Sequence, residues 1–315
     1  MAASSTQFPE LANVTRVLME SNLQPTQGHR FQATGFPDLG PARYQAPDGT
    51  EMLLVESAQS VANRMEAVCW DPVKKTLIED LVGLPYVSVT SPGSSELTNS
   101  VLEAHRINSE YIMYDKSPVR EAFESEVEYR KDAPIDWHKF YRALFKYDPN
   151  SLVHGCFLEE ISGRLRVPRA LTGFIEASSV GAVESGGVKF NRVQPDLKEG
   201  KGHVPYHRTE FTANRITAYF NLDLALIRSF NLGAGATDLL IALSFFKVRR
   251  FLSEGLRLRT ACDLCEIERL RVTAPSGFTA PEENAVKRVI KETILSCAAD
   301  GLFPAEPVSS MPPKS

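Results

Sequence analysis

Hydrophobic and polar residues alternate along three segments of the chain, which is the pattern of half-buried β-strands. The longest segment runs from Arg215 to Ile227, and two shorter ones occupy residues 164–167 and 256–259. A short, continuous apolar run at residues 52–55 predicts a further strand that is buried on both faces.

Apolar residues spaced three and four apart predict helices between these strands. Ser57 is expected to cap one of them, with Val61, Met65 and Val68 on its inner face. Further helices are predicted at residues 96–110, 135–146, 237–253 and 281–298. Helices that separate strands of alternating character predict an α+β fold, in which an antiparallel sheet carries helices on one face. The other face of the sheet would be free to meet a ligand.

The two ends of the chain carry no such pattern. Residues 1–27 are polar and aperiodic, and residues 303–315 contain four prolines, so we expect both segments to be flexible. Residues 28–302 are expected to form a single domain. Within it, Glu184–Glu210 is rich in glycine and cations and lacks periodicity, which indicates a functional arm or a disordered insertion. As an arm, it would contact phosphates and stack on bases.

The charges are distributed unevenly, although the net charge is only −4. From Arg164 to Arg271 there are 17 Lys/Arg against 11 Asp/Glu, whereas the rest of the chain has 18 against 28. Such a basic block can place positive potential on one surface of an acidic protein, and nucleic acid is then the expected partner. A block in sequence need not form one patch in space, and the alternative is an ordinary solvated surface.

Arginines occur in pairs on two of the predicted strands. Arg164 and Arg166 share one strand face, and Arg257 and Arg259 share another, while the intervening leucines and valine point to the core. Side chains two residues apart on a strand lie roughly 7 Å from each other, close to the spacing of phosphates in an extended nucleic acid. The pairs therefore favour phosphate binding over a plain outward-facing surface.

The composition does not indicate a membrane or secreted protein. No apolar run reaches the ~20 residues of a membrane span, and residues 1–9 lack a signal-peptide pattern. Five cysteines fit a reducing cytosol, so we expect a cytoplasmic location and no membrane partner. Cys262 and Cys265 form a lone C-x-x-C, and His203 and His207 an H-x3-H. Cysteines three apart on a strand face opposite sides, so we expect no metal and no other cofactor.

Motifs for catalysis are missing. The sequence has no G-x-S-x-G, no phosphate-binding glycine loop of the NTPases, no dinucleotide fingerprint and no H-E-x-x-H. Asp38 lies in the glycine-flanked turn at residues 35–40 and could serve a metal-assisted nuclease, but turn chemistry explains it as well. We therefore expect that the protein is not an enzyme.

Several segments together resemble one family. They are residues 27–38, 54–64, 164–171, 185–189, 219–226 and 255–263. In this order they resemble the backbone subunit of type I-G (formerly I-U) CRISPR effector complexes, a branch of the RAMP superfamily. The resemblance spans residues 20–300.

The resemblance implies a ferredoxin-like (RRM-like) palm with large insertions, and a chain that binds CRISPR guide RNA without catalysis. Copies of the subunit would line up along the guide as a helical filament, with a thumb from one copy displacing a base held by the next. Other effector subunits, the target DNA strand paired to the guide and a separate helicase-nuclease would be its further partners. The arm at 184–210 becomes the candidate thumb, and Asn63 and Arg64 join the candidate RNA-binding residues. The full set is Arg30, Asn63, Arg64, Arg164, Arg166, Arg169, Lys189, Arg192, Lys201, Arg208, Arg249, Arg250, Arg257 and Arg259.

The chain departs from this family pattern in two places. It lacks the aromatic RNP motifs of a compact RRM, and it lacks the glycine-rich loop near the C-terminus that marks RNA-processing RAMP relatives. Two alternatives stay open. One is a RAMP-type endoribonuclease that uses Asp38 or a histidine to process guide RNA, and the other is a protein-only scaffold in which the basic block binds the acidic part of a neighbouring copy.

Overall fold

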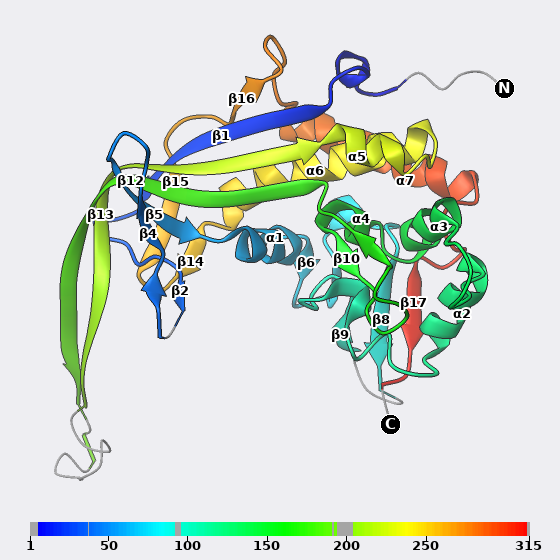
Figure 1. The fold of residues 1–315 in the computed structure, drawn as a ribbon, viewed down its shortest axis with the longest axis horizontal. Coiled ribbons are helices and arrows are strands. Elements are labelled where there is room, and N and C mark those ends of the chain that lie inside the picture. Colours follow the sequence, from blue (N-terminus) through cyan, green and yellow to red (C-terminus); the bar gives the residue numbers. More distant parts are fainter. Residues whose placement is uncertain (1–5, 37, 92–95, 191, 194–203, 314–315) are drawn as a thin grey trace.

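The fold is described from a computed structural model that places residues 6–36, 38–91, 96–190, 192–193 and 204–313. A long antiparallel sheet forms the spine of the molecule (Figure 1). A two-stranded hairpin projects from one end of this sheet, and a smaller lobe of helices and short strands lies at the other end (Figure 1). Among the described residues, no helix is long and apolar enough to cross a membrane.

The central sheet contains eight antiparallel strands. In neighbour order they are β14 (Arg257–Arg259), β15 (Cys262–Glu266), β1 (Arg16–Pro25), β13 (Val204–Asp223), β12 (Leu171–Lys189), β5 (Glu51–Glu56) and β4 (Arg43–Gln45), with β16 (Arg271–Ala274) also paired to β1. The prediction of an antiparallel sheet within a mixed α/β fold is confirmed.

The inner face of the sheet is formed by every second residue of its strands. In β13, Ile216, Ala218, Phe220 and Leu222 are all buried, and on β1 they lie opposite Leu23, Ser21, Met19 and Val17. The predicted strand ends earlier than expected, at Asp223. The Asp223 carboxylate accepts a hydrogen bond from Leu226 N at 2.9 Å and caps helix α5, so the last apolar residues of the run are helical.

Seven α-helices lie in the described part of the chain. Those beside the sheet are α1 (Ala58–Ala67), α5 (Leu224–Ser229), α6 (Ala234–Glu254) and α7 (Glu283–Ala299). The predicted cap of α1 is confirmed, because Ser57 Oγ accepts a hydrogen bond from Ser60 N at 3.3 Å. Helix α6 is buried along most of its length, and its Phe251 meets Phe220 of the sheet edge to face, with ring centroids 6.1 Å apart.

The smaller lobe is formed by residues between α1 and β12, together with the end of the chain. Its elements are β8 (Tyr86–Thr90), β9 (Glu96–Asn99), a 3-10 turn (Arg106–Asn108), α2 (Pro118–Val127), α3 (Trp137–Tyr147), α4 (Pro149–His154), β10 (Cys156–Phe157), β11 (Arg166–Val167) and β17 (Val308–Met311). Two short hairpins, β2 (Gly35–Phe36) with β3 (Gly40–Pro41) and β6 (Trp70–Asp71) with β7 (Thr76–Leu77), and two 3-10 turns (Pro9–Leu11 and Glu79–Leu81) complete the described fold.

The prediction of a helix at residues 96–110 is wrong. This segment begins as strand β9, and the chain then turns because the Asn99 side chain accepts hydrogen bonds from Val101 N and Leu102 N. An asparagine that bonds the backbone ahead of it favours a turn over a helix. The neighbouring prediction at residues 135–146 is confirmed by α3.

Neither terminus is free in the way the sequence indicated. Residues 16–25 form β1 in the middle of the sheet, and Gln7 N bonds to the buried Asp238 carboxylate at 2.8 Å. The alternation of β1 is hidden because Ser21 occupies a buried position, where its hydroxyl bonds to Glu266. At the other end, β17 pairs in parallel with β8, so the expectation of a disordered tail is also wrong.

The described parts of the segment 184–210 are not structureless, because β12 and β13 stay paired out to Lys189 and Val204. Together they form the projecting hairpin of Figure 1. Glycines concealed these strands in the sequence. A Cβ at Gly186 would lie 2.6 Å from the Tyr206 carbonyl oxygen, so the close approach of the two strands requires glycine there.

Candidate nucleic-acid interface

A cleft of about 860 Å³ opens where helix α1 meets the lobe. Its walls come from α1, the 3-10 turn after β9, and the segment that runs from α4 through β11. Predicted RNA-binding residues from two distant parts of the sequence meet here, namely Asn63 on α1 and Arg166 and Arg169 on the opposite wall. Gln59, His105 and His154 also line the cleft, and the sequence analysis did not identify them.

The two arginines of the cleft have no carboxylate partner among the described residues. The Arg166 guanidinium lies over the Phe157 ring, 4.1 Å from its centroid, and Arg169 donates to the Gln59 side-chain oxygen. Both contacts orient a guanidinium group without cancelling its charge. These arginines can therefore bind an anion from outside the chain.

A buried network of polar side chains lies beneath the cleft. Arg106 makes a bidentate ion pair with Glu66 of α1, with N–O distances of 2.7 and 2.8 Å. Asn150 donates to the same carboxylate and accepts from Lys247 of α6. The Lys247 ammonium also lies 3.1 Å from His154 Nε2. The network thus ties α1, α4 and α6 to the wall of the cleft.

The charges of this network do not balance. Burial lowers the pKa of His154 well below its ordinary value, and the positive charges of Lys247, Arg106 and Arg169 lower it further. Burial also raises the pKa of the Asp148 carboxyl from 3.8 to about 7, so this group carries only part of a negative charge at neutral pH. The Glu66 carboxylate, paired with Arg106, is then the main negative charge of the buried network, which also holds the Lys247 ammonium.

His154 supplies a further sign of a missing partner. An ammonium group only donates hydrogen bonds, so Lys247 makes Nε2 of His154 an acceptor and places the ring hydrogen on Nδ1. This Nδ1 is buried and has no hydrogen-bond partner among the described residues. A buried donor without an acceptor is uncommon in folded proteins and favours binding of a ligand or water there.

Gly155 brings the two walls together. It has φ +76°, and a Cβ at this position would lie 2.7 Å from Val167 O. Only glycine allows the end of α4 to pass so close to β11. This contact places Arg169 beside His154 and thereby shapes the cleft.

A second cluster of cations lies at the junction of the sheet with the projecting hairpin. Arg30 and Arg257 line a hollow of about 490 Å³. Arg30 pairs with Glu210 at 2.9 Å, and Arg208 pairs with the same carboxylate at 3.0 Å. Arg257 lies 3.8 Å from Asp263. The hollow is therefore closer to neutral than the cleft.

Four of the predicted RNA-binding arginines use their donors inside the fold. Arg64 donates to Leu258 O, Arg249 to Ala280 O, Arg250 to Val68 O, and Arg259 to Gln32 O and Val55 O. Arg259 also pairs with the buried Glu56. It was expected to face solvent beside Arg257, but the Glu56 carboxylate draws it inward.

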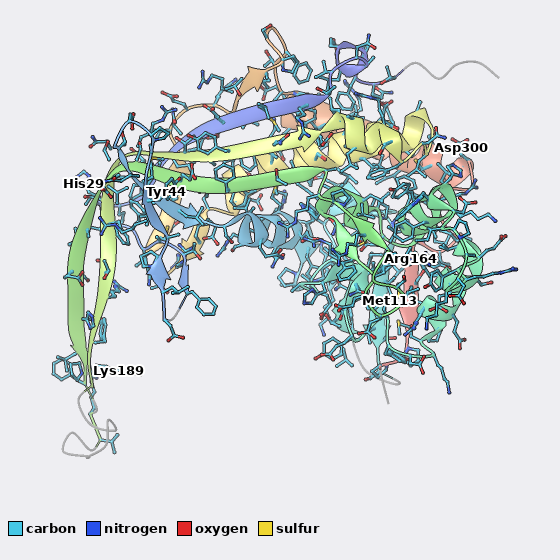
Figure 2. All side chains as sticks on the ribbon, viewed as in Figure 1. His29, Tyr44, Met113, Arg164, Lys189 and Asp300 are labelled. Carbon is cyan, nitrogen blue, oxygen red and sulfur yellow. The ribbon has the colours of Figure 1, made fainter. Side chains whose placement is uncertain are left out.

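The paired-arginine strands do not lie in one sheet. Strand β11 pairs only with β10 among the described strands, whereas β14 is at an edge of the central sheet. Their apolar residues, Leu165, Val167, Leu256 and Leu258, are buried as predicted. Arg164 lies outside β11 and donates to Lys131 O at 2.9 Å. Figure 2 shows Arg164 on the lobe, far from Lys189 near the end of the hairpin.

The remaining cations belong to the hairpin. Lys189 and Arg192 are exposed, and Lys201 lies outside the described residues. His203 also lies outside the described residues. Cys262 is buried while Cys265 is partly exposed on the other side of β15, and no group of three metal-binding side chains gathers within the described ranges.

Comparison with known proteins identifies the family. Residues 17–182 match the family model described as CRISPR-associated protein GSU0053. The chain belongs to this CRISPR-associated family. The matched segment begins in β1 and ends in β12, so it includes α1, the lobe except β17, and every wall of the cleft.

Two solved structures are similar in their chain path. One, titled "CRISPR RNA-guided surveillance complex, pre-nicking", has 12% identity and a TM-score of 0.41 over 80% of this chain and 76% of that chain. The other, "CRISPR RNA-guided surveillance complex", has 13% identity and a TM-score of 0.41 over 91% and 83%. No curated protein matches the sequence.

Proposed function

We propose that this CRISPR-associated protein is a non-catalytic backbone subunit of a type I-G surveillance complex, in which copies of the chain assemble along the guide RNA. The observation that carries the proposal is the cleft, where Arg166 and Arg169 have no carboxylate partner among the described residues. A polyanion is the ligand that such a surface favours.

The sheet supports the palm that this function requires. The strands β15, β1, β13 and β12 are neighbours in that order, α1 lies in the connection from β1 to β12, and α6 in the connection from β13 to β15. This is the strand order of a ferredoxin-like βαββαβ unit with antiparallel neighbours. In this interpretation the lobe is an insertion after α1, and the single palm spans residues 28–302 together with β1.

The projecting hairpin supports the thumb. It carries Lys189 away from the sheet (Figure 2), where Lys189 and the nearby Arg192 would reach the guide bound to a neighbouring copy, while Arg208 lies closer to the sheet beside Glu210. Target DNA would pair with the guide held in this way, and a separate helicase-nuclease would cut it. The assembly would act in the cytoplasm.

Salt-dependent RNA binding tests the proposal. Purified protein should lose orders of magnitude of affinity for single-stranded RNA between ~50 and ~200 mM salt, with little dependence on sequence. The double variant Arg166→Gln/Arg169→Gln should bind more weakly, and the slope of log K against log salt should fall by about 1.4, or 0.7 per lost phosphate contact. Equal binding at both salt concentrations would refute the proposal.

Arg164→Gln is the matched control, because Arg164 lies two residues from Arg166 but faces Lys131 outside the cleft. It should keep the wild-type affinity and slope. Circular dichroism of all variants should be unchanged. An Arg164 variant that weakens binding as much as the double variant would show that the cleft is not the binding site.

The proposal includes the absence of catalysis. Asp38 is exposed on the turn between β2 and β3, with no cluster of metal ligands around it in the described structure. Guide RNA incubated with the protein and a divalent cation should therefore stay intact. Defined cleavage products that disappear in Asp38→Ala would instead favour a RAMP-type endoribonuclease.

A further inference from the structure

The hairpin of β2 and β3 exposes two large apolar side chains at its tip. Phe36 is 65% exposed and Leu39 is 85% exposed. Single exposed apolar residues are common on protein surfaces, but here two share one short turn. An apolar pair of this kind on a projecting turn indicates contact with another molecule.

The backbone of the turn is built to hold this shape. A Cβ at Gly35 would lie 3.0 Å from the carbonyl carbon of Gly40, and Gly40 has φ +68°. Leu39 N donates to Phe36 O at 3.1 Å and closes the turn. Both positions favour glycine, Gly35 because of the close Gly40 backbone and Gly40 because of its positive φ, so the sequence suits a tight hairpin that exposes Phe36 and Leu39.

The base of the hairpin is fixed to the central sheet. Thr34 N donates to Val55 O at 2.9 Å, and Leu54 N donates to Ala42 O at 3.0 Å. Arg259 adds a hydrogen bond to Gln32 O at 2.7 Å. Both ends of the segment are thus bound to β5, and Arg259 of β14 holds the chain before it, so the tip projects from a rigid support.

The charge of the tip determines which part of a nucleic acid it can meet. Residues 34–41 contain no Lys or Arg, and Asp38 lies between the two apolar residues. A carboxylate repels phosphates, whereas it can accept hydrogen bonds from the amino groups of bases. The tip is therefore suited to bases and unsuited to the sugar-phosphate backbone.

The hairpin lies on the side of the sheet toward which the long β12–β13 hairpin projects, between that hairpin and α1 (Figure 1). We propose that Phe36 and Leu39 form a wedge that packs against or between the bases of the bound RNA strand. This inference rests on the proposed RNA-binding function. Apolar wedges and aromatic stacking of this kind are common ways in which proteins contact bases.

The test uses Phe36→Ala/Leu39→Ala in the full-length chain and two single-stranded probes of equal length, an ordinary RNA and an abasic oligonucleotide. The variant should bind the ordinary RNA about tenfold more weakly, since stacking on one base is worth ~1–3 kcal/mol. Its salt slope should equal that of wild type because no phosphate contact is lost. Binding of the abasic probe should not change.

Leu295→Ala is the control for the loss of an exposed apolar side chain, because Leu295 is 64% exposed on α7. It should leave all affinities unchanged. Unchanged RNA affinity of the Phe36/Leu39 variant would overturn the wedge while leaving the proposed function intact. Equal losses on both probes, or lost self-association with normal RNA affinity, would also overturn it. A wild-type protein that binds no RNA would overturn the proposed function and the wedge together.

Discussion

The arginines of the cleft and the arginines of strand β14 are alike in sequence but differ in what surrounds them. Arg166 and Arg169 lie against an aromatic ring and an amide, and among the described residues no carboxylate neutralises them. Arg259 instead pairs with Glu56, which is 2% exposed, and bonds to two backbone carbonyls. The difference shows that a count of cations identifies a basic segment but does not separate binding residues from structural ones.

The largest effect is expected at Arg259. The change Arg259→Leu would leave the Glu56 carboxylate buried, with Arg64, 3.8 Å away, as its one cationic partner among the described residues. Removing one member of a buried ion pair lowers the free energy of unfolding by about 3 kcal/mol or more. Urea denaturation monitored by circular dichroism measures this loss. A variant as stable as wild type would show that Arg259 is not structural, and that the contrast with the cleft is false.

An effect that depends on pH is expected at Asp148, beneath the cleft. Its folded-state pKa is raised from 3.8 to about 7, so the folded protein binds this proton more tightly than the unfolded chain does. Stability contributed by the protonated carboxyl is therefore lost as pH rises from 3.8 to about 7, and is constant above that range.

The variant Asp148→Asn removes this titration. Asparagine has a similar size. Its side-chain oxygen can still accept a hydrogen bond at the start of α4, where Asp148 accepts one from Asn150 N in the wild-type protein. The difference in unfolding free energy between Asp148→Asn and wild type should shift in favour of the variant as pH rises through this window. His154 is present in both proteins, so its contribution to the pH dependence of the unfolding free energy drops out of this difference. A difference that does not depend on pH would contradict the raised pKa.

The smallest effect on stability is expected at Arg257, two residues from Arg259 on the same strand. Its side chain is 73% exposed and lies 3.8 Å from a half-exposed Asp263. Exposed ion pairs contribute little, so Arg257→Leu should change the unfolding free energy by less than about 0.5 kcal/mol. The same denaturation experiment makes Arg257 the matched control for Arg259. A large loss at Arg257 would remove the distinction between the two positions.

Local periodicity predicted the elements whose inner face is mostly apolar, although α1 buries Glu66 and α6 buries Lys247. It identified the helix capped by Ser57, the helices α3, α6 and α7, and the central strand β13 up to Asp223. It failed where a polar residue is buried, as at Ser21 in β1, or where glycines occupy a strand, as at Gly186 in β12. In these places the long-range pairing of strands determines the structure.

The cleft was predictable only in part. Asn63, Arg166 and Arg169 were each proposed from sequence, but their convergence depends on a contact between α4 and β11 that no local pattern indicates. His154 could not be distinguished from an ordinary core histidine. A signal was present in Lys247, a lysine within an otherwise apolar helix, because a buried cation requires polar partners nearby.

The parallel pairing of β17 with β8 has a practical consequence for handling this protein. Residues 308–311 cover one edge of β8, while β9 covers the other. A truncation before Val308, which the sequence would suggest because the tail was expected to be disordered, would expose the backbone donors and acceptors along one edge of β8. An exposed strand edge can pair with strands of other molecules. The truncated protein should therefore aggregate, independently of RNA binding.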